Sequence, residues 1–241
     1  MKYIKKDIKN EPESLRIYRN TTPNPVYKGG SFDQQTLKIA LLKEQGFLCA
    51  YCMGRISLDL NKVHKPKIEV EHYFSQVLSK QENTNKELLY QNMLGVCNGL
   101  SISYPEVRKV HHCDKTAGKE GKMNGDVQLR KLDPRLPKCE QLISYTKGGE
   151  ILATHGDEDV KHDLEKALNL NNKVLIEARR NTLDSAKDKL LREKPVQQWN
   201  RAFLQKHIDE WLSLKDGRFP RYCMIAVWFL TELMNKPLYN R

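Results

Sequence analysis

The sequence predicts a mainly helical α+β fold, in which a small β-containing core precedes a helical C-terminal third. Three observations predict this class. Residues 67–72 alternate apolar and charged side chains with a period of two, as half-buried strands do. Residues 33–45 place apolar residues at helical spacing after Asp33, a residue type that caps helices. Residues 159–235 carry leucines and aromatic residues, partly at helical spacing.

We divide the chain into an N-terminal arm (1–32), a core region (33–135) and a C-terminal region (136–241). Three prolines and a Gly-Gly pair interrupt the polar arm, which we therefore expect to be irregular. A second Gly-Gly pair predicts a hairpin over residues 145–151 at the start of the C-terminal region.

The remainder of the C-terminal region is predicted to be helical. Leucine spacing indicates two helices within 159–194, with a break near residues 169–172. A helix carrying Trp199 and Trp211 follows, and a proline is well placed to open a final helix over 222–235. Large aromatic residues are usually core residues, although docking of a partner protein is the functional alternative for this region.

The 241 residues carry a formal net charge of +11, which favours a polyanionic partner. Nucleic acid is our first expectation and an acidic protein the second. The basic N-terminus has no apolar segment typical of a secretory signal. The longest apolar run, residues 222–230, is too short to span a membrane, which requires about 20 residues. We therefore expect a cytoplasmic protein.

Four of the six cysteines have a spacing that suggests a structural zinc site. Cys49 and Cys52 form a CxxC motif after the first predicted helix, and Cys97 and Cys113 lie downstream. Four thiolates suffice for tetrahedral zinc. Use of the CxxC motif in thioredoxin-like redox chemistry would require a βαβ setting, which this region lacks.

The fourth zinc ligand is open at this point. His111 or His112 could replace Cys113, because neutral imidazole is an equally good zinc ligand. The other two cysteines, Cys139 and Cys223, are interpreted as packed core residues.

The order of these motifs resembles the core of an HNH nuclease. That order is Cys49-Ala-Tyr-Cys52, Glu71-His72 at a strand end, Asn92 before Cys97, and Cys113-Asp114 followed by Lys119. The resemblance implies a ββα-metal core, stapled here by zinc, that hydrolyses phosphodiesters with Mg²⁺ or Mn²⁺. It implies that His72 is the general base, that Glu71 and Asp114 bind the divalent cation, and that Asn92 fixes the loop.

Elementary chemistry agrees with these roles. Imidazole titrates near neutral pH, and hard carboxylate oxygens suit Mg²⁺ or Mn²⁺, whereas thiolates select zinc. Lys115 and Lys119 are expected to contact phosphate, together with the neighbouring Arg108, Lys109 and Lys122. Charged residues of this kind can also simply solvate a surface.

Further motifs resemble the HNH family associated with retrons and Septu anti-phage systems. They are Asp133-Pro134, Cys139, the hairpin with Gly-Gly-Glu-Ile151, Leu168-Asn-Leu-Asn171, Arg179 and Arg180. The resemblance implies an ABC/SMC-type ATPase partner and, in retron versions, a reverse transcriptase with its small reverse-transcribed DNA.

The chain departs from many HNH cores at three points. Glu71 stands where Asp is common, Asp114 stands where Asn or His is common, and residues 98–112 separate the last two cysteines. The insertion leaves open a metal role for Asn98 or for the histidines that precede Cys113.

The leading hypothesis is an endonuclease that cuts DNA. A zinc-stapled nucleic-acid or protein adaptor without catalysis is the alternative from another class, and a toxin that cleaves tRNA is a third interpretation.

Overall fold

The computed structural model describes residues 1–58, 67–82, 84–103, 108–116 and 129–239. Within them the chain is α+β, as expected. Its α-helices are α1 (Glu13–Thr21), α2 (Gln34–Glu44), α3 (Gln76–Gln81), α5 (Glu158–His162), α6 (Lys173–Glu193), α7 (Arg201–Trp211) and α8 (Cys223–Met234). Its strands are β1 (Ile68–His72), β2 (Met93–Cys97), β3 (Leu100–Ser103), β4 (Arg108–His111), β5 (Ile143–Tyr145) and β6 (Ile151–Ala153).

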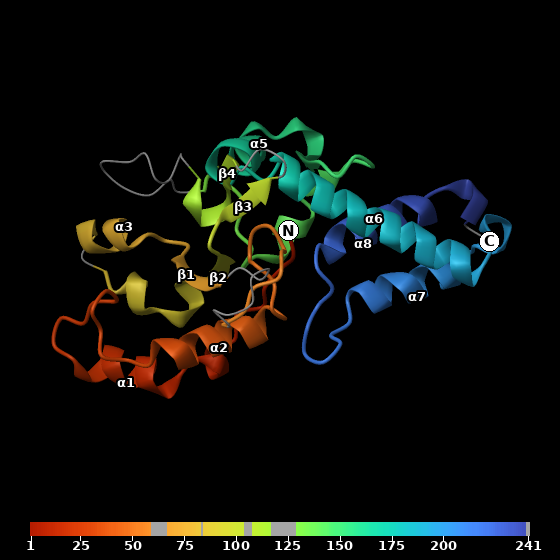
Figure 1. Cartoon of the computed structure of the whole chain (residues 1–241). Coiled ribbons are helices and arrows are strands. Elements are labelled where there is room, and N and C mark those ends of the chain that lie inside the picture. Colours follow the sequence, from red (N-terminus) through yellow and green to blue (C-terminus); the bar gives the residue numbers. More distant parts are fainter. Residues whose placement is uncertain (59–66, 83, 104–107, 117–128, 240–241) are drawn as a thin grey trace.

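The strands form three separate antiparallel pairs, β1–β2, β3–β4 and β5–β6. The first two pairs lie near the middle of the molecule in Figure 1, with α1, α2 and α3 at one end. Helices α6, α7 and α8 extend to the other end (Figure 1). One continuous set of buried apolar residues runs through both parts.

Helix α2 and strand β1 lie where the sequence predicts them. Asp33 caps α2 by accepting hydrogen bonds from the backbone N–H groups of Gln35 and Thr36. Strand β1 pairs with β2 so that His72 lies opposite Met93. The alternating apolar and charged residues therefore end at His72, the last residue of strand β1.

The expectation of an irregular N-terminal arm is wrong for residues 13–21, which form α1. Pro12 stands at the N-cap, where proline is compatible with a helix start. The helix buries Leu15 and Tyr18. The prolines mark the boundaries of a short amphipathic helix, so their presence did not exclude one.

The predicted hairpin and helical region are present. Strands β5 and β6 form the hairpin. Helices α5 and α6 are separated by a break near residues 169–172, and Asn172 caps α6 at the end of this break. Trp199 precedes α7, which begins only after Asn200 caps it. Helix α8 begins at Cys223, three residues after Pro220, because Tyr222 adopts a left-handed conformation.

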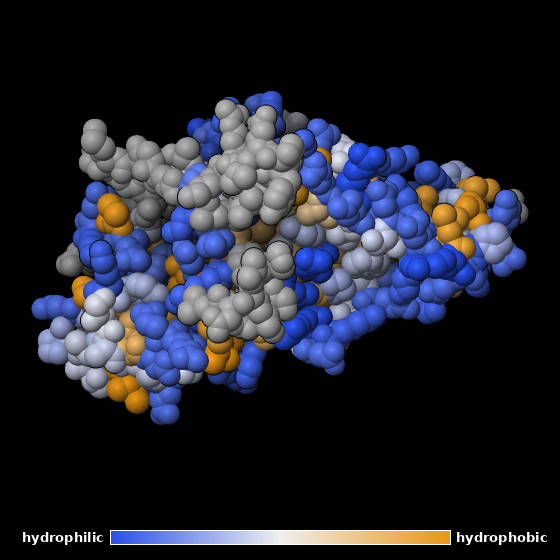
Figure 2. Space-filling model, in the orientation of Figure 1, coloured by the Kyte–Doolittle hydropathy of each residue, from blue (hydrophilic) through white to orange (hydrophobic). Residues whose placement is uncertain are grey.

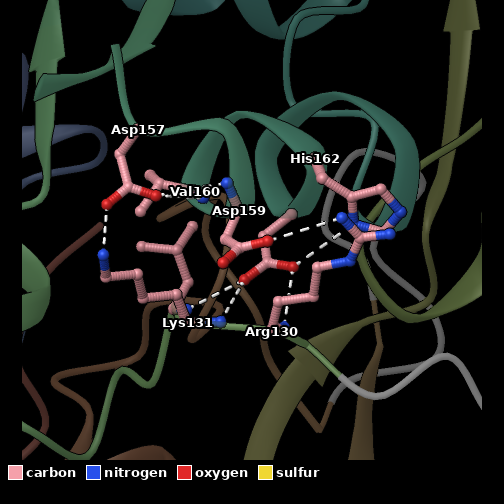
Figure 3. A network of polar contacts seen from close by, with 8 residues as sticks. Arg130, Lys131, Asp157, Asp159, Val160 and His162 are labelled. Carbon is pink, nitrogen blue, oxygen red and sulfur yellow. Dashed lines mark hydrogen bonds and ion pairs between the residues drawn. The ribbon is translucent and has the colours of Figure 1, made fainter. Parts of the chain in front are cut away.

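A fully buried carboxylate joins two distant segments (Figure 3). Asp163 accepts backbone hydrogen bonds from Arg130, Lys131 and Leu132 at 2.8–2.9 Å. Asp157 caps α5 and pairs with Lys131 (Figure 3). Three N–H donors compensate the buried charge and fix residues 130–132 against the helices that follow.

Among the described residues, no helix is both long enough and apolar enough to cross a membrane. Figure 2 shows a largely hydrophilic face, with hydrophobic side chains grouped near the end of the C-terminal helices. Leu191, Val196 and Leu238 are among the large apolar residues that the structure leaves exposed.

Candidate metal centre and active site

The four cysteines predicted to bind zinc meet in the structure. The Sγ atoms of Cys49, Cys52, Cys97 and Cys113 all lie within 4.8 Å of one another, and all four residues are buried. Among the described residues, no other group of three or more His, Cys, Asp or Glu side chains gathers this closely. Four buried sulfur donors fit a tetrahedral ion such as zinc.

A tight loop presents the first two cysteines to β2. The backbone N–H of Met53 bonds to the carbonyl of Cys49 at 3.0 Å, which closes a turn around the CxxC motif. The N–H of Ala50 bonds to Gly95 O at 3.0 Å and anchors this turn to β2. We call residues 46–55 the CxxC loop.

The insertion at residues 98–112 is accommodated by a second hairpin. Strands β3 and β4 pair in antiparallel register, with Leu100 opposite His111. Because the two ends of a hairpin are adjacent, Cys113 returns beside Cys97. Cys97 and Cys113 are therefore close in space although residues 98–112 separate them in the sequence.

The thiol environment also favours a bound cation. Burial opposes ionisation of Cys49, but hydrogen bonds from Cys113, Cys52 and Cys97 hold its pKa well below the ordinary value. Burial and the same hydrogen bonding raise the pKa of Cys113. The Cys49 thiolate is thus stabilised while ionisation of Cys97 and Cys113 is opposed, and a bound dication would stabilise the thiolate form of its ligands.

His112 contacts this cluster from its edge. Its Nδ1 atom lies 3.1 Å from Cys113 Sγ and 3.9 Å from Cys97 Sγ, and the residue is buried. Burial lowers the pKa of His112. The gathering of the four sulfur atoms favours Cys113 as the fourth ligand, with His112 as its hydrogen-bond partner.

Arg179 brings a buried positive charge near the thiols. The residue is 1% exposed, and its guanidinium donates to Gly149 O and, at 2.8 Å, to Leu170 O. Burial lowers the pKa of Arg179, while the charges of Tyr145, Tyr222, Cys52 and Cys113 raise it. The guanidinium therefore links α6 to the surroundings of the cysteine cluster.

His72, the predicted general base, is buried at the end of β1. Its Nδ1 atom lies 3.1 Å from the side-chain amide of Gln76, in the first turn of α3. The ring of Tyr27 packs edge-on against the imidazole, with 4.3 Å between the ring centroids. Two side chains from outside the strand therefore fix the orientation of His72.

Of the predicted cation-binding carboxylates, Glu71 and Asp114, the first contacts Tyr51. The Tyr51 hydroxyl donates a hydrogen bond to Glu71 Oε1 at 3.2 Å. Burial, the charge of Glu71 and then that of Asp114 raise the pKa of Tyr51 well above its ordinary value. Tyr51 belongs to the CxxC loop, so this loop carries both two of the four cysteines and a hydrogen-bond partner of Glu71.

Asn92, predicted to fix a loop, bonds to the backbone that follows β1. Its amide donates to Phe74 O at 2.8 Å and Lys86 O at 3.0 Å, and its Oδ1 accepts from Phe74 N at 2.7 Å. These bonds hold the segment after His72 against the start of β2.

The predicted phosphate contact Lys115 has carboxylate neighbours. Its Nζ atom lies 2.9 Å from Glu69 and 3.6 Å from Asp114. Its role as a phosphate ligand therefore stays a prediction. Lys119 and Lys122 lie outside the described residues, and Arg108 and Lys109 are placed only as part of β4.

Three site residues were missed by the sequence reasoning: Tyr27, Tyr51 and Gln76. Tyr51 lies inside the CxxC motif, where a buried hydroxyl close to a strand acid could have been suspected. Gln76 lies four residues after His72, but this pairing depends on the turn between β1 and α3. No local signal connects Tyr27 to His72.

No protein-family model matches the chain. The Escherichia coli protein named Retron Ec83 putative HNH endonuclease is 33% identical to it over 82 residues. The match covers 34% of this chain and only 28% of that relative. It supports a nuclease role and a relationship to HNH endonucleases of the retron type.

Proposed function

We propose that the chain is a metal-dependent HNH endonuclease that hydrolyses phosphodiester bonds in nucleic acid, with DNA the favoured substrate. The observation that carries the proposal is the position of His72 at a strand end beside Glu71. Asp114 directly follows the last cysteine of the cluster, and Tyr51 donates a hydrogen bond to Glu71. The partial match to a retron HNH protein agrees with it.

Each residue has a defined task in this proposal. His72 removes a proton from the attacking water, and Gln76 and Tyr27 hold its ring in place. Glu71 and Asp114 would bind Mg²⁺ or Mn²⁺, since such ions are commonly held by one or two carboxylates and the substrate phosphate. The divalent cation, when bound, neutralises charge that develops on the leaving oxygen.

The cysteine cluster would hold zinc in a structural role. All four ligand positions are then filled by protein thiolates, as in structural rather than catalytic zinc sites. Asn92 keeps the loop after the general base fixed to β2.

We test the activity with purified, zinc-loaded protein on supercoiled plasmid, single-stranded DNA and tRNA, with Mg²⁺ or Mn²⁺. We expect cutting of DNA, and a rate lower by about 100-fold or more in His72→Ala, because a general base contributes that much. His155→Asn is the matched control: it removes an exposed histidine at a positive φ that Asn tolerates.

Cutting that persists unchanged in His72→Ala would contradict the assigned chemistry. Cutting of tRNA alone would replace DNA by RNA as the substrate. No cutting of any substrate, with or without an ATPase partner, would favour the adaptor function.

We further propose that the nuclease serves anti-phage defence beside an ABC/SMC-type ATPase, and in a retron setting beside a reverse transcriptase and its DNA product. The name of the matching protein supports the retron setting. The exposed apolar side chains Leu191, Val196 and Leu238 make the C-terminal helices a candidate docking region. Co-purification of the ATPase with the full chain, and its loss on charge substitution at these three positions, is the test.

A further inference from the structure

A second cluster of positive charge lies outside the candidate active site. Its members are Lys2, Arg55, Lys215, Arg218 and Arg221, which we call the basic patch. They come from the N-terminus, the CxxC loop and the α7–α8 loop. Figure 1 shows the α7–α8 loop turning back toward the N-terminal half of the chain.

The α7–α8 loop has a defined shape. Lys215 and Arg218 exchange two backbone hydrogen bonds, of 2.9 and 3.0 Å, around a turn at Asp216-Gly217. Both turn residues have positive φ, which suits Asp-Gly. The loop therefore presents the side chains of Lys215 and Arg218 on a short hairpin, with both residues exposed.

This loop is attached to the CxxC loop at two backbone positions. Phe219 N–H bonds to Gly46 O at 3.1 Å, and Tyr222 N–H bonds to Met53 O at 3.2 Å. An alanine-sized side chain at Gly46 would come within 2.4 Å of the Phe219 ring, so the approach is close. The metal-binding loop thus sets the position of the patch.

Arg55 joins the two loops through its guanidinium. It donates to Gly46 O at 3.0 Å and also to Phe219 O. Partial burial and then the charges of Arg218 and Arg221 lower the pKa of Arg55, which agrees with three guanidinium groups lying near one another. Backbone acceptors in both loops hold the Arg55 guanidinium in place despite these like charges.

Two of the cations lie over aromatic rings. The Arg218 guanidinium is 4.8 Å from the centre of the Phe47 ring, and Lys2 Nζ is 4.7 Å from that of Phe219. Among the described residues, no member of the patch forms an ion pair with a carboxylate. The nearby Glu44 already pairs with Lys6.

We propose that the basic patch binds the phosphodiester backbone of a nucleic-acid strand, as an anchoring surface separate from the cleavage site. The inference rests on the proposed nuclease function. Guanidinium groups match phosphate geometry because they offer two donors side by side. Lys115, by contrast, already has two carboxylate neighbours.

The test measures binding of a short labelled DNA duplex by zinc-loaded His72→Ala protein over a series of NaCl concentrations, without added Mg²⁺. We compare it with the same protein carrying Arg218→Ala and Arg221→Ala. The slope of log affinity against log salt should decrease by about 0.9 for each phosphate group that the protein no longer neutralises. Arg218→Lys with Arg221→Lys should keep most of the slope, because the charge is retained.

Lys173→Ala with Arg192→Ala is the matched control, since it removes two exposed cations from α6. If the slope decreased as much in the Lys173/Arg192 variant as in the Arg218/Arg221 variant, the effect would not be local to the basic patch and the inference would be overturned. An unchanged slope in the Arg218/Arg221 variant would overturn the inference alone, in favour of an acidic protein surface as partner. Failure of the His72→Ala protein to bind the duplex at every salt concentration would overturn DNA as the substrate in the nuclease proposal as well.

Discussion

The region of β1 to β4 and the region of α6 to α8 bury different kinds of side chain. The first consists of two-stranded sheets with strands of four or five residues, and together with the CxxC loop and Cys113 it buries four cysteines, Glu71, His72 and Asn92. The second contains a helix of 21 residues and buries mainly leucine, isoleucine and phenylalanine.

This difference determines what stabilises each region. Isolated two-stranded sheets are marginal in water and need further contacts. In the strand region buried apolar residues such as Ile68, Met93 and Leu94 supply part of those contacts, and a bound metal would supply further free energy. The helices are stabilised by apolar packing, which requires no ligand. The candidate site lies in the part of the molecule whose folding a bound metal would stabilise.

The largest expected effect is the loss of a metal ligand. Cys97→Ala should abolish zinc binding and unfold the strand region, while α6, α7 and α8 keep most of their helicity. We expect a loss of more than about 5 kcal/mol of stabilisation of the strand region, because metal binding is coupled to folding. Metal analysis, circular dichroism and mapping of protease cleavage sites measure these changes.

Cys139→Ala is the matched control for this variant. Cys139 is fully buried but lies outside the cluster, so the zinc content should not change. The comparison between the regions would be wrong if both regions lost structure together in Cys97→Ala.

An intermediate effect is expected from Leu183→Ala in α6, where the side chain is 0% exposed. The cavity should reduce the free energy of unfolding by about 3 kcal/mol. Zinc content at temperatures below unfolding should be unchanged. Urea denaturation measures the free energy, and Leu191→Ala, at a residue that is 53% exposed in the same helix, should have a far smaller effect.

The smallest of the three effects is expected from Asn92→Ala. Without the Asn92 side-chain amide, the N–H and C=O of Phe74 and the C=O of Lys86 lose a hydrogen-bond partner. The free energy of unfolding should decrease by about 2 kcal/mol. Cleavage should decrease as well, because the loop after His72 loses its attachment to β2. Thermal unfolding and plasmid cutting measure the two effects, with Gln91→Ala as the exposed neighbouring control. Unchanged stability would show that the loop does not depend on Asn92.

Sequence patterns predicted the elements whose signals are local. The cap at Asp33, the alternation that ends at His72 and the glycine turn of the β5–β6 hairpin each act within a few residues. Helix α1 was missed because its flanking prolines were interpreted as loop residues. The Leu-Ser-Ile-Ser alternation of β3 was available as a signal but was not used.

The parts of the site that are defined by the order of motifs along the sequence could be predicted. The four cysteines could be selected from their order around the strand, and the structure brings them together. The contacts of Tyr51 with Glu71 and of Tyr27 with His72 join segments 20 or more residues apart, so no local pattern encodes them. The assignment of His72, Glu71 and Asp114 to catalysis stays a prediction.

The β3–β4 hairpin has a consequence for how such proteins can change over time. Cys97 and Cys113 flank the end of the β3–β4 ladder at which Leu100 pairs with His111. Residues added in cross-strand pairs at the other end would lengthen the ladder without separating this one. Relatives can therefore carry projections of very different length at this point and retain the same four-sulfur centre, and a search by fixed cysteine spacing would fail to find them.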